Sequence, residues 1–315
     1  MNSFRHLYGP VPSRRLGRSL GIDLVPHKIC TYDCIYCQIG KTTEKTLVRK
    51  EYVPVGEILK EVGHFLEEGS SSIDYLSLGG SGEPTLHSKI RSIIEGLKKI
   101  TSIPVAVITN GFLLWNSEVR KDLLQADIVL PSLDAVSQEV FMKINRPQPG
   151  VSMNKVIEGM VEFRKLYKGQ IWLEILFCKG VNDGKEELVW MKEAVDRIQP
   201  DRIHLNTVVR PPSEKRAGPL KKKEMEEIHA LFGKKASIIS GFDRHLSLVS
   251  EKDIKGEILK ILKRRPLSRS DLSEGMGIPE NELDRYIKPL IQDRKVQTRI
   301  FSDSFYYEIS ENQRE

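Results

Sequence analysis

Short apolar runs alternate with helical patterns along most of this chain, and this alternation constrains the fold more than any other feature. The runs are rich in Val, Ile and Leu, as is typical of strands that are covered by helices. The six runs are residues 20–25, 73–80, 103–111, 127–134, 170–180 and 202–209, and residues 236–242 are a candidate seventh. Six strand–helix units in succession predict an α/β protein with a parallel sheet, either open or curled into a partial barrel.

The pattern changes near Val249. Residues 250–266, 268–277 and 279–295 have the pattern of three helices, and residues 296–301 and 305–310 that of a β-hairpin. This order predicts a winged helix-turn-helix, with Gly277 in the turn between its second and third helices. We therefore expect two domains, residues 1–248 and 249–315. Residues 251–315 carry 13 basic and 13 acidic side chains, so nucleic-acid contact and protein docking both stay open for the second domain.

The basic charge of the chain is concentrated at its N-terminal end. The whole chain has a formal net charge of +6, and residues 1–50 alone account for it, with nine Lys or Arg against three Asp or Glu. This segment is either a solvated basic arm or a cationic entrance that attracts an anionic substrate. Four cysteines without a disulfide pattern, and the absence of a signal segment or membrane span, predict a soluble cytoplasmic protein without a membrane partner.

Three of the four cysteines lie within eight positions, directly after the first predicted strand. Cys30, Cys34 and Cys37 have the spacing C-x3-C-x2-C. They are reduced structural thiols, zinc ligands that His27 completes to a Cys3His tetrahedron, or the ligands of a 4Fe-4S cluster. Three protein ligands leave one of the four irons of such a cluster open to bind another molecule.

This cysteine motif after the first strand of a parallel strand–helix array resembles the radical S-adenosylmethionine superfamily, and Tyr36 beside the last cysteine fits the pattern. The resemblance extends over about residues 15–245, and residues 8–42 are most similar to the wyosine-synthetase-like Fe-S oxidoreductase group. It implies a partial (β/α)6 TIM-type barrel, a 4Fe-4S cluster and S-adenosylmethionine. It also implies a flavodoxin- or ferredoxin-like one-electron donor and a 5′-deoxyadenosyl radical that takes hydrogen from the substrate.

The same resemblance implies that polar residues at the carboxyl ends of the strands contact the cofactor. "SGE" after the second strand matches the element that meets the amino group of S-adenosylmethionine, and "ITNG" and "PSLD" follow the next two strands. The residues assigned to the cofactor are Tyr36, Ser81, Gly82, Glu83, Thr109, Asn110, Ser132, Asp134 and Asn206. Strand ends that share one edge of a parallel sheet would bring them together.

Cys178, at the end of the fifth strand, is the one candidate for a catalytic thiol, as a hydrogen-atom donor or a substrate ligand. The alternative is a small buried side chain. After the sixth strand, residues 208–223 form a basic loop that includes Arg210 and is suited to gripping phosphate or carboxylate groups.

The substrate stays undecided between two classes. The basic segment favours RNA modification, whereas a neutral winged helix favours a protein or peptide substrate of the kind that activating enzymes modify. The second cluster of the wyosine-forming enzymes needs three further cysteines before the motif, and no cysteine precedes Cys30. A transcriptional Fe-S sensor is a remote third hypothesis, because it would have no use for the cofactor-type loops.

Overall fold

The computed structural model describes residues 4–68, 73–239, 254–276, 278–302 and 304–310. Its centre is an eight-stranded sheet with the order β1-β2-β5-β6-β7-β8-β9-β10. All neighbours from β2 to β10 are parallel, whereas β1 pairs with β2 in the antiparallel sense. The strands are β1 (Leu7–Ser13), β2 (Gly17–Ile22), β5 (Tyr75–Leu78), β6 (Val105–Thr109), β7 (Ile128–Pro131), β8 (Gln170–Phe177), β9 (Arg202–Thr207) and β10 (Ala236–Ile238).

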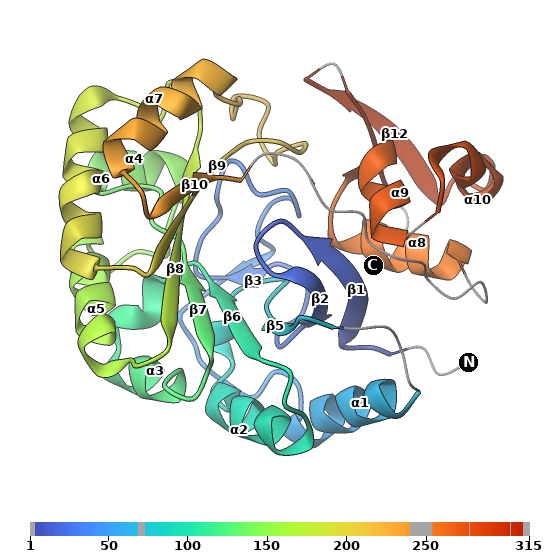
Figure 1. Ribbon diagram of the computed structural model, residues 1–315, viewed down its shortest axis with the longest axis horizontal. Helices are drawn as coiled ribbons and strands as arrows, with labels where there is room; N and C mark the ends of the chain where they lie inside the picture. Colours follow the sequence, from blue (N-terminus) through green and yellow to red (C-terminus); the bar gives the residue numbers. More distant parts are fainter. Residues whose placement is uncertain (1–3, 69–72, 240–253, 277, 303, 311–315) are drawn as a thin grey trace.

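The helices lie along the outer side of the curved sheet (Figure 1). They are α1 (Val55–Glu67), α2 (Ile90–Ile100), α3 (Ser117–Asp122), α5 (Met153–Leu166), α6 (Lys185–Ile198) and α7 (Lys222–Phe232), with the short α4 (Gln138–Ile144) after β7. Helix α2 illustrates why the helices cover the sheet. One of its faces is apolar and fully buried, and it consists of Ile90, Ile93, Ile94 and Leu97 at helical spacing. All four residues of β7 are buried, as expected of a strand covered on both sides.

The parallel sheet of an α/β protein is confirmed, with two differences from the predicted strands. The first predicted strand, residues 20–25, is β2 and begins earlier, because Ser19 to Ile22 pair with Tyr75 to Leu78. The sequence analysis did not predict β1. The candidate seventh run forms β10, which continues the parallel order beside β9.

The C-terminal unit consists of α8 (Ile254–Arg264), β11 (Leu267–Ser268), α9 (Arg269–Met276), α10 (Glu280–Gln292), β12 (Val296–Phe301) and β13 (Ser304–Ile309). The three strands form a small sheet with the order β11-β13-β12. The unit has its own apolar core, which also includes Val11 of β1. Helices α8 and α9 contact β1, so the unit lies beside the antiparallel edge of the large sheet (Figure 1).

Two predictions fall on residues outside the described ranges. These are the domain boundary at 248/249 and the turn at Gly277. Among the helices that the structure describes, none has the length and apolar character needed to cross a membrane.

Candidate functional site

Two adjoining cavities lie at the carboxyl ends of the parallel strands. The arginine cavity, of about 240 Å³, is lined by Arg14, Arg15, Arg210 and Arg265 together with Tyr36, Cys37, Ser132, Glu174 and Asn206. The glycine-loop cavity, of about 250 Å³, is lined by Cys30, Gly82, Glu83, Thr109 and Asn110. Ser132, Arg15 and Arg265 line both, so one ligand can face the other across a common wall.

The cysteine loop is held in place by the segment that follows α4 and by the loop that follows β9. The backbone N–H of Asp33 donates to the carbonyl oxygen of Asn145 at 3.0 Å. Nε of Arg146 donates to the carbonyl oxygen of Asp33 at 2.7 Å. Oγ of Ser213 donates to the carbonyl oxygen of Cys34 at 2.9 Å. The thiols are therefore positioned by contacts from distant parts of the chain.

Each of the three thiols has a nitrogen donor beside it. Nζ of Lys28 lies 3.1 Å from Sγ of Cys37, Nδ2 of Asn145 lies 3.4 Å from Sγ of Cys34, and Nδ2 of Asn110 lies 3.5 Å from Sγ of Cys30. Donors directed at sulfur stabilise the negative charge of metal-bound thiolates. Burial, with repulsion from Glu83, raises the pKa of the Cys30 thiol to about 12, so a metal must displace its proton. The donor set fits a metal cluster.

The zinc alternative does not fit the arrangement. His27 is exposed, and no three His, Cys, Asp or Glu side chains among the described residues converge on a point suited to one metal ion. A cluster needs wider spacing than a single ion, because each thiolate binds a different iron. The three cysteines therefore match a cluster better than a closed tetrahedral ion site.

Glu83 is 2% exposed and holds two loops together. Its Oε1 accepts hydrogen bonds from the backbone N–H of Thr85 at 3.0 Å and from Oγ1 of Thr109 at 2.6 Å, and its Oε2 accepts one from the N–H of Asn110 at 2.8 Å. Burial raises the pKa of the Glu83 carboxyl, and these hydrogen bonds oppose the shift. The carboxylate thus fixes the loops after β5 and β6 where they line the glycine-loop cavity.

Gly82 permits a close contact between the same loop and the cysteine loop. A Cβ at this position would lie 2.1 Å from the carbonyl oxygen of Ile29, which no side chain permits. The backbone N–H of Glu83 donates to that same carbonyl at 3.0 Å. The glycine therefore brings the strand-end loop against the residue that precedes Cys30.

Asp134 and Ser81, two of the predicted cofactor residues, are not among the residues that line the two cavities. Asp134 is 4% exposed; its Oδ2 accepts from the Tyr36 hydroxyl and from Nδ2 of Asn145 at 2.9 Å. Ser81 is 2% exposed, and its backbone N–H donates to Oδ1 of Asp23 at 2.8 Å. Hydrogen bonds within the protein thus engage the carboxylate of Asp134 and the backbone of Ser81, and their contact with the cofactor stays a prediction.

The other predicted cofactor residues line the cavities. Gly82, Glu83, Thr109 and Asn110 line the glycine-loop cavity, Tyr36 and Asn206 line the arginine cavity, and Ser132 lines both. Asn206 donates from Nδ2 to Oε1 of Glu174 at 3.0 Å and accepts from Nη1 of Arg14 at 3.3 Å. Asn206 is therefore a member of the arginine cavity, on the side away from the glycine loop.

The structure places the predicted catalytic thiol, Cys178, outside the lining of both cavities. Its side chain is 0% exposed and belongs to the main apolar core. Burial raises the pKa of this thiol far above its usual range. This burial favours the alternative interpretation, in which Cys178 is a small buried side chain, and a catalytic role for the thiol stays a prediction.

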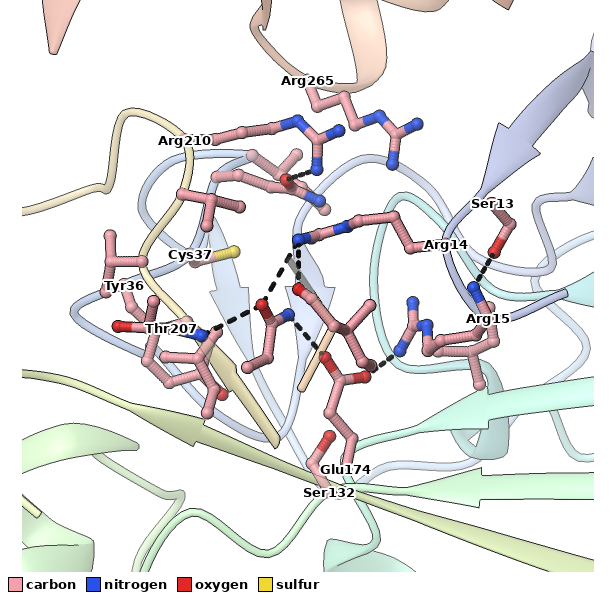
Figure 2. Close-up of a pocket in the computed structure, with 18 residues that line it drawn as sticks. Ser13, Arg14, Arg15, Tyr36, Cys37, Ser132, Glu174, Thr207, Arg210 and Arg265 are labelled. Atoms are coloured by element: carbon pink, nitrogen blue, oxygen red, sulfur yellow. Dashed lines mark hydrogen bonds and ion pairs between the residues drawn. The ribbon is translucent and has the colours of Figure 1, made fainter. Parts of the chain in front are cut away.

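The basic N-terminal segment is not a solvated arm. Its first part is β1, and the turn after β1 directs Arg14 and Arg15 into the arginine cavity (Figure 2). The sequence analysis did not single out Arg14 or Arg15. It also did not single out Lys28, Glu174 or Arg265. The basic pattern "PSRRLGR" was the available signal for Arg14 and Arg15, whereas Arg265 comes from the other unit and had none.

Comparison with known proteins places the chain in a family. The model of the Radical SAM superfamily matches residues 24–189, more than half of the chain. The UPF0026 protein of Methanocaldococcus jannaschii is 33% identical over 305 residues, which span 95% of this chain and 94% of that protein. The GTPase Obg of Brachyspira hyodysenteriae is 37% identical over 309 residues; they span 97% of this chain but only 45% of that protein.

A likeness to a solved structure supports the fold. A radical SAM methyltransferase from Sphaerobacter thermophilus superposes with a TM-score of 0.53 at 14% identity, covering 70% of this chain and 65% of that one. The chain therefore belongs to the radical SAM superfamily, and within it to the family of UPF0026 proteins. It is an enzyme of this type, and its cofactors are a 4Fe-4S cluster and S-adenosylmethionine.

Proposed function

We propose that Cys30, Cys34 and Cys37 ligate the 4Fe-4S cluster, and that S-adenosylmethionine occupies the glycine-loop cavity. The observation that carries this proposal is that Cys37 lines the arginine cavity and Cys30 the glycine-loop cavity, while each of the three thiols has a nitrogen donor beside it. When bound, the cluster and S-adenosylmethionine supply a 5′-deoxyadenosyl radical, which removes a hydrogen atom from the substrate.

The residues of this chain position the reactants and exclude competing reactions. Glu83 holds the loop ends of the glycine-loop cavity, and Asp134 accepts a hydrogen bond from Tyr36 of the cysteine loop. Ser132 lies in the wall that both cavities share, where cofactor and substrate would meet. Their role is to keep the substrate within reach of the radical and water away from it.

The finer assignment of the fold belongs to the same proposal. The curved sheet, with β1 and β10 at its opposite ends, supports a partial (β/α)6-type barrel. The order of three helices and two long strands in the C-terminal unit supports a winged helix-turn-helix.

For the substrate, we favour RNA, as in the wyosine-synthetase-like group. The arginine cavity provides cations at the site itself, in keeping with the anionic substrate that the N-terminal charge suggested. A protein partner is the second candidate, because the first turn of α10 presents Glu280 and Glu282, which repel nucleic acid. A flavodoxin- or ferredoxin-like protein would donate the electron.

The test is anaerobic reconstitution of the full chain with iron and sulfide, followed by electron paramagnetic resonance and measurement of 5′-deoxyadenosine. We expect a 4Fe-4S signal and product from the wild type, and neither from Cys34→Ala; Cys178→Ala is the matched control and should retain both. A Cys34→Ala variant that still cleaves S-adenosylmethionine would contradict the assignment. Binding of total tRNA at several salt concentrations tests the RNA substrate, which requires affinity that falls with salt.

A further inference from the structure

The arginine cavity contains more positive than negative side-chain charge. Four guanidinium groups line it, and two of them have a carboxylate partner. Arg15 pairs with Glu174, and Nη2 of Arg210 lies 3.5 Å from Oδ1 of Asp271. Figure 2 shows Arg14, Arg210 and Arg265 directed toward the same part of the cavity. Within the described ranges, the other two guanidinium groups therefore form no ion pair with a carboxylate.

Among the described residues, Arg14 and Arg265 have no carboxylate within ion-pair distance, although Asp271 attracts both from farther away. Nη1 of Arg14 donates to Oδ1 of Asn206 at 3.3 Å and to the carbonyl oxygen of Ile239 at 3.0 Å, both neutral acceptors. Within the part of the chain that the structure describes, the side chain of Arg265 makes no hydrogen bond or ion pair. Burial and repulsion from Arg210 lower the pKa of both guanidiniums to about 9.

In the described part of the chain, Arg210 lacks a hydrogen-bond acceptor at one atom of its guanidinium group. Its side chain is 5% exposed, and its Nε is buried without a hydrogen-bond partner. A buried N–H that lacks an acceptor costs free energy, and adjacent buried cations repel one another. An anion in the cavity would remove both costs at once.

We propose that Arg14, Arg210 and Arg265 form a binding site for a phosphate group of the substrate. This inference deepens the proposed function by naming the group that the enzyme recognises. A guanidinium group can donate two parallel hydrogen bonds to two oxygens of a phosphate. Three guanidinium groups therefore suit a ligand with several charged oxygens. The same cavity is lined by Cys37 and Ser132, so carbon atoms near that phosphate would lie close to the cofactor.

The site is complete only when the C-terminal unit is in place. Arg265 follows α8, and Ile261 of α8 lines the glycine-loop cavity. The unit is tied to the strand-end loop after β9, because the hydroxyl of Tyr306 donates to the carbonyl oxygen of Val209 at 2.7 Å. The C-terminal unit thus supplies a wall and a ligand of the substrate site.

The experiment measures binding of pyrophosphate to the reconstituted full chain by calorimetry, and the rise in melting temperature that pyrophosphate causes at constant ionic strength. We compare the wild type with Arg265→Gln and Arg14→Gln, and use Arg285→Gln, an exposed arginine of α10, as the matched control. Loss of one guanidinium–phosphate contact should weaken binding roughly tenfold. Without pyrophosphate, Arg265→Gln should be at least as stable as the wild type, because repulsion is relieved.

Parallel titrations with a nucleoside 5′-monophosphate and with tRNA distinguish a small phosphorylated substrate from RNA. The proposal is overturned if the wild type binds none of these ligands, or if all variants bind them as the wild type does. It is also overturned if Arg265→Gln binds S-adenosylmethionine more weakly but binds the phosphate ligands as the wild type does, because the arginines would then hold the cofactor carboxylate. Phosphate binding without formation of 5′-deoxyadenosine would support this site while contradicting the proposed chemistry.

Discussion

The two cavities that meet at Ser132 differ in how their charged groups are satisfied. In the glycine-loop cavity, the buried carboxylate of Glu83 accepts hydrogen bonds from both neighbouring loops. In the arginine cavity, Arg210 retains an unpaired buried Nε, and Arg14 has only neutral acceptors. One wall is complete before any ligand binds, whereas the other has an electrostatic deficit.

This difference suggests a division of roles. A cofactor that every member of a superfamily uses can be met by a rigid, internally bonded wall, which loses little entropy on binding. A substrate that differs from enzyme to enzyme is recognised by groups that this chain adds. Here those groups come from the turn after β1, the loop after β9 and the C-terminal unit. The contrast can be tested by removing charges from each wall in turn.

Glu83→Ala should have the largest effect on stability. The variant leaves the buried N–H groups of Thr85 and Asn110 without acceptors. This should lower the free energy of unfolding by about 4 kcal/mol. Urea unfolding under anaerobic conditions measures the loss, and Glu67→Ala, at an exposed site in α1, is the control. A loss no greater than that of the control would mean that the glycine-loop wall does not depend on this carboxylate.

Arg15→Gln separates the paired from the unpaired arginines. Arg15 forms an ion pair with Glu174 in the lining of the arginine cavity, and removing Arg15 leaves that carboxylate with the amide of Asn206. We expect a loss of about 3 kcal/mol in unfolding free energy, as for a broken buried pair. Arg265→Gln should show no such loss. Equal destabilisation by the two variants would remove the distinction between paired and unpaired guanidiniums.

Local patterns predicted the cysteine loop and the strand-end motifs, because each lies in one short segment. Residues that meet from distant segments were beyond such patterns: Arg265 reaches the cavity only through packing of the C-terminal unit on β1. Strand β1 contains Pro10 and Pro12, which argue against a strand in the interior of a sheet. Because β1 lies at the edge, its prolines are tolerated. The internal bonding of Asp134 likewise depends on Tyr36, which is 98 positions away in sequence.

His204 gives a prediction that depends on pH, because its imidazole is buried close to two arginines. Burial, then repulsion from Arg15 and Arg202, lowers its pKa to about 4. Below pH 6.5 the unfolded chain therefore binds a proton at this histidine, whereas the folded chain binds it only near pH 4. The free energy of unfolding consequently decreases as the pH is lowered through this window. Relative to His204→Leu, the wild type should lose about 2 kcal/mol more between pH 7 and pH 5. Parallel stability curves for the two proteins would exclude this effect.

Lys28 places its ammonium group beside a thiol of the cysteine loop, and its replacement should give the smallest change. It is 4% exposed, with its Nζ 3.1 Å from Sγ of Cys37. A buried cation next to a cluster ligand stabilises the reduced, more negative cluster, so Lys28→Met should make the reduction potential more negative by tens of millivolts. Redox titration followed by electron paramagnetic resonance measures this shift. Lys41→Met, an exposed lysine of the same loop, should leave the potential unchanged; an equal shift in both variants would assign the effect to general charge rather than to the contact with Cys37.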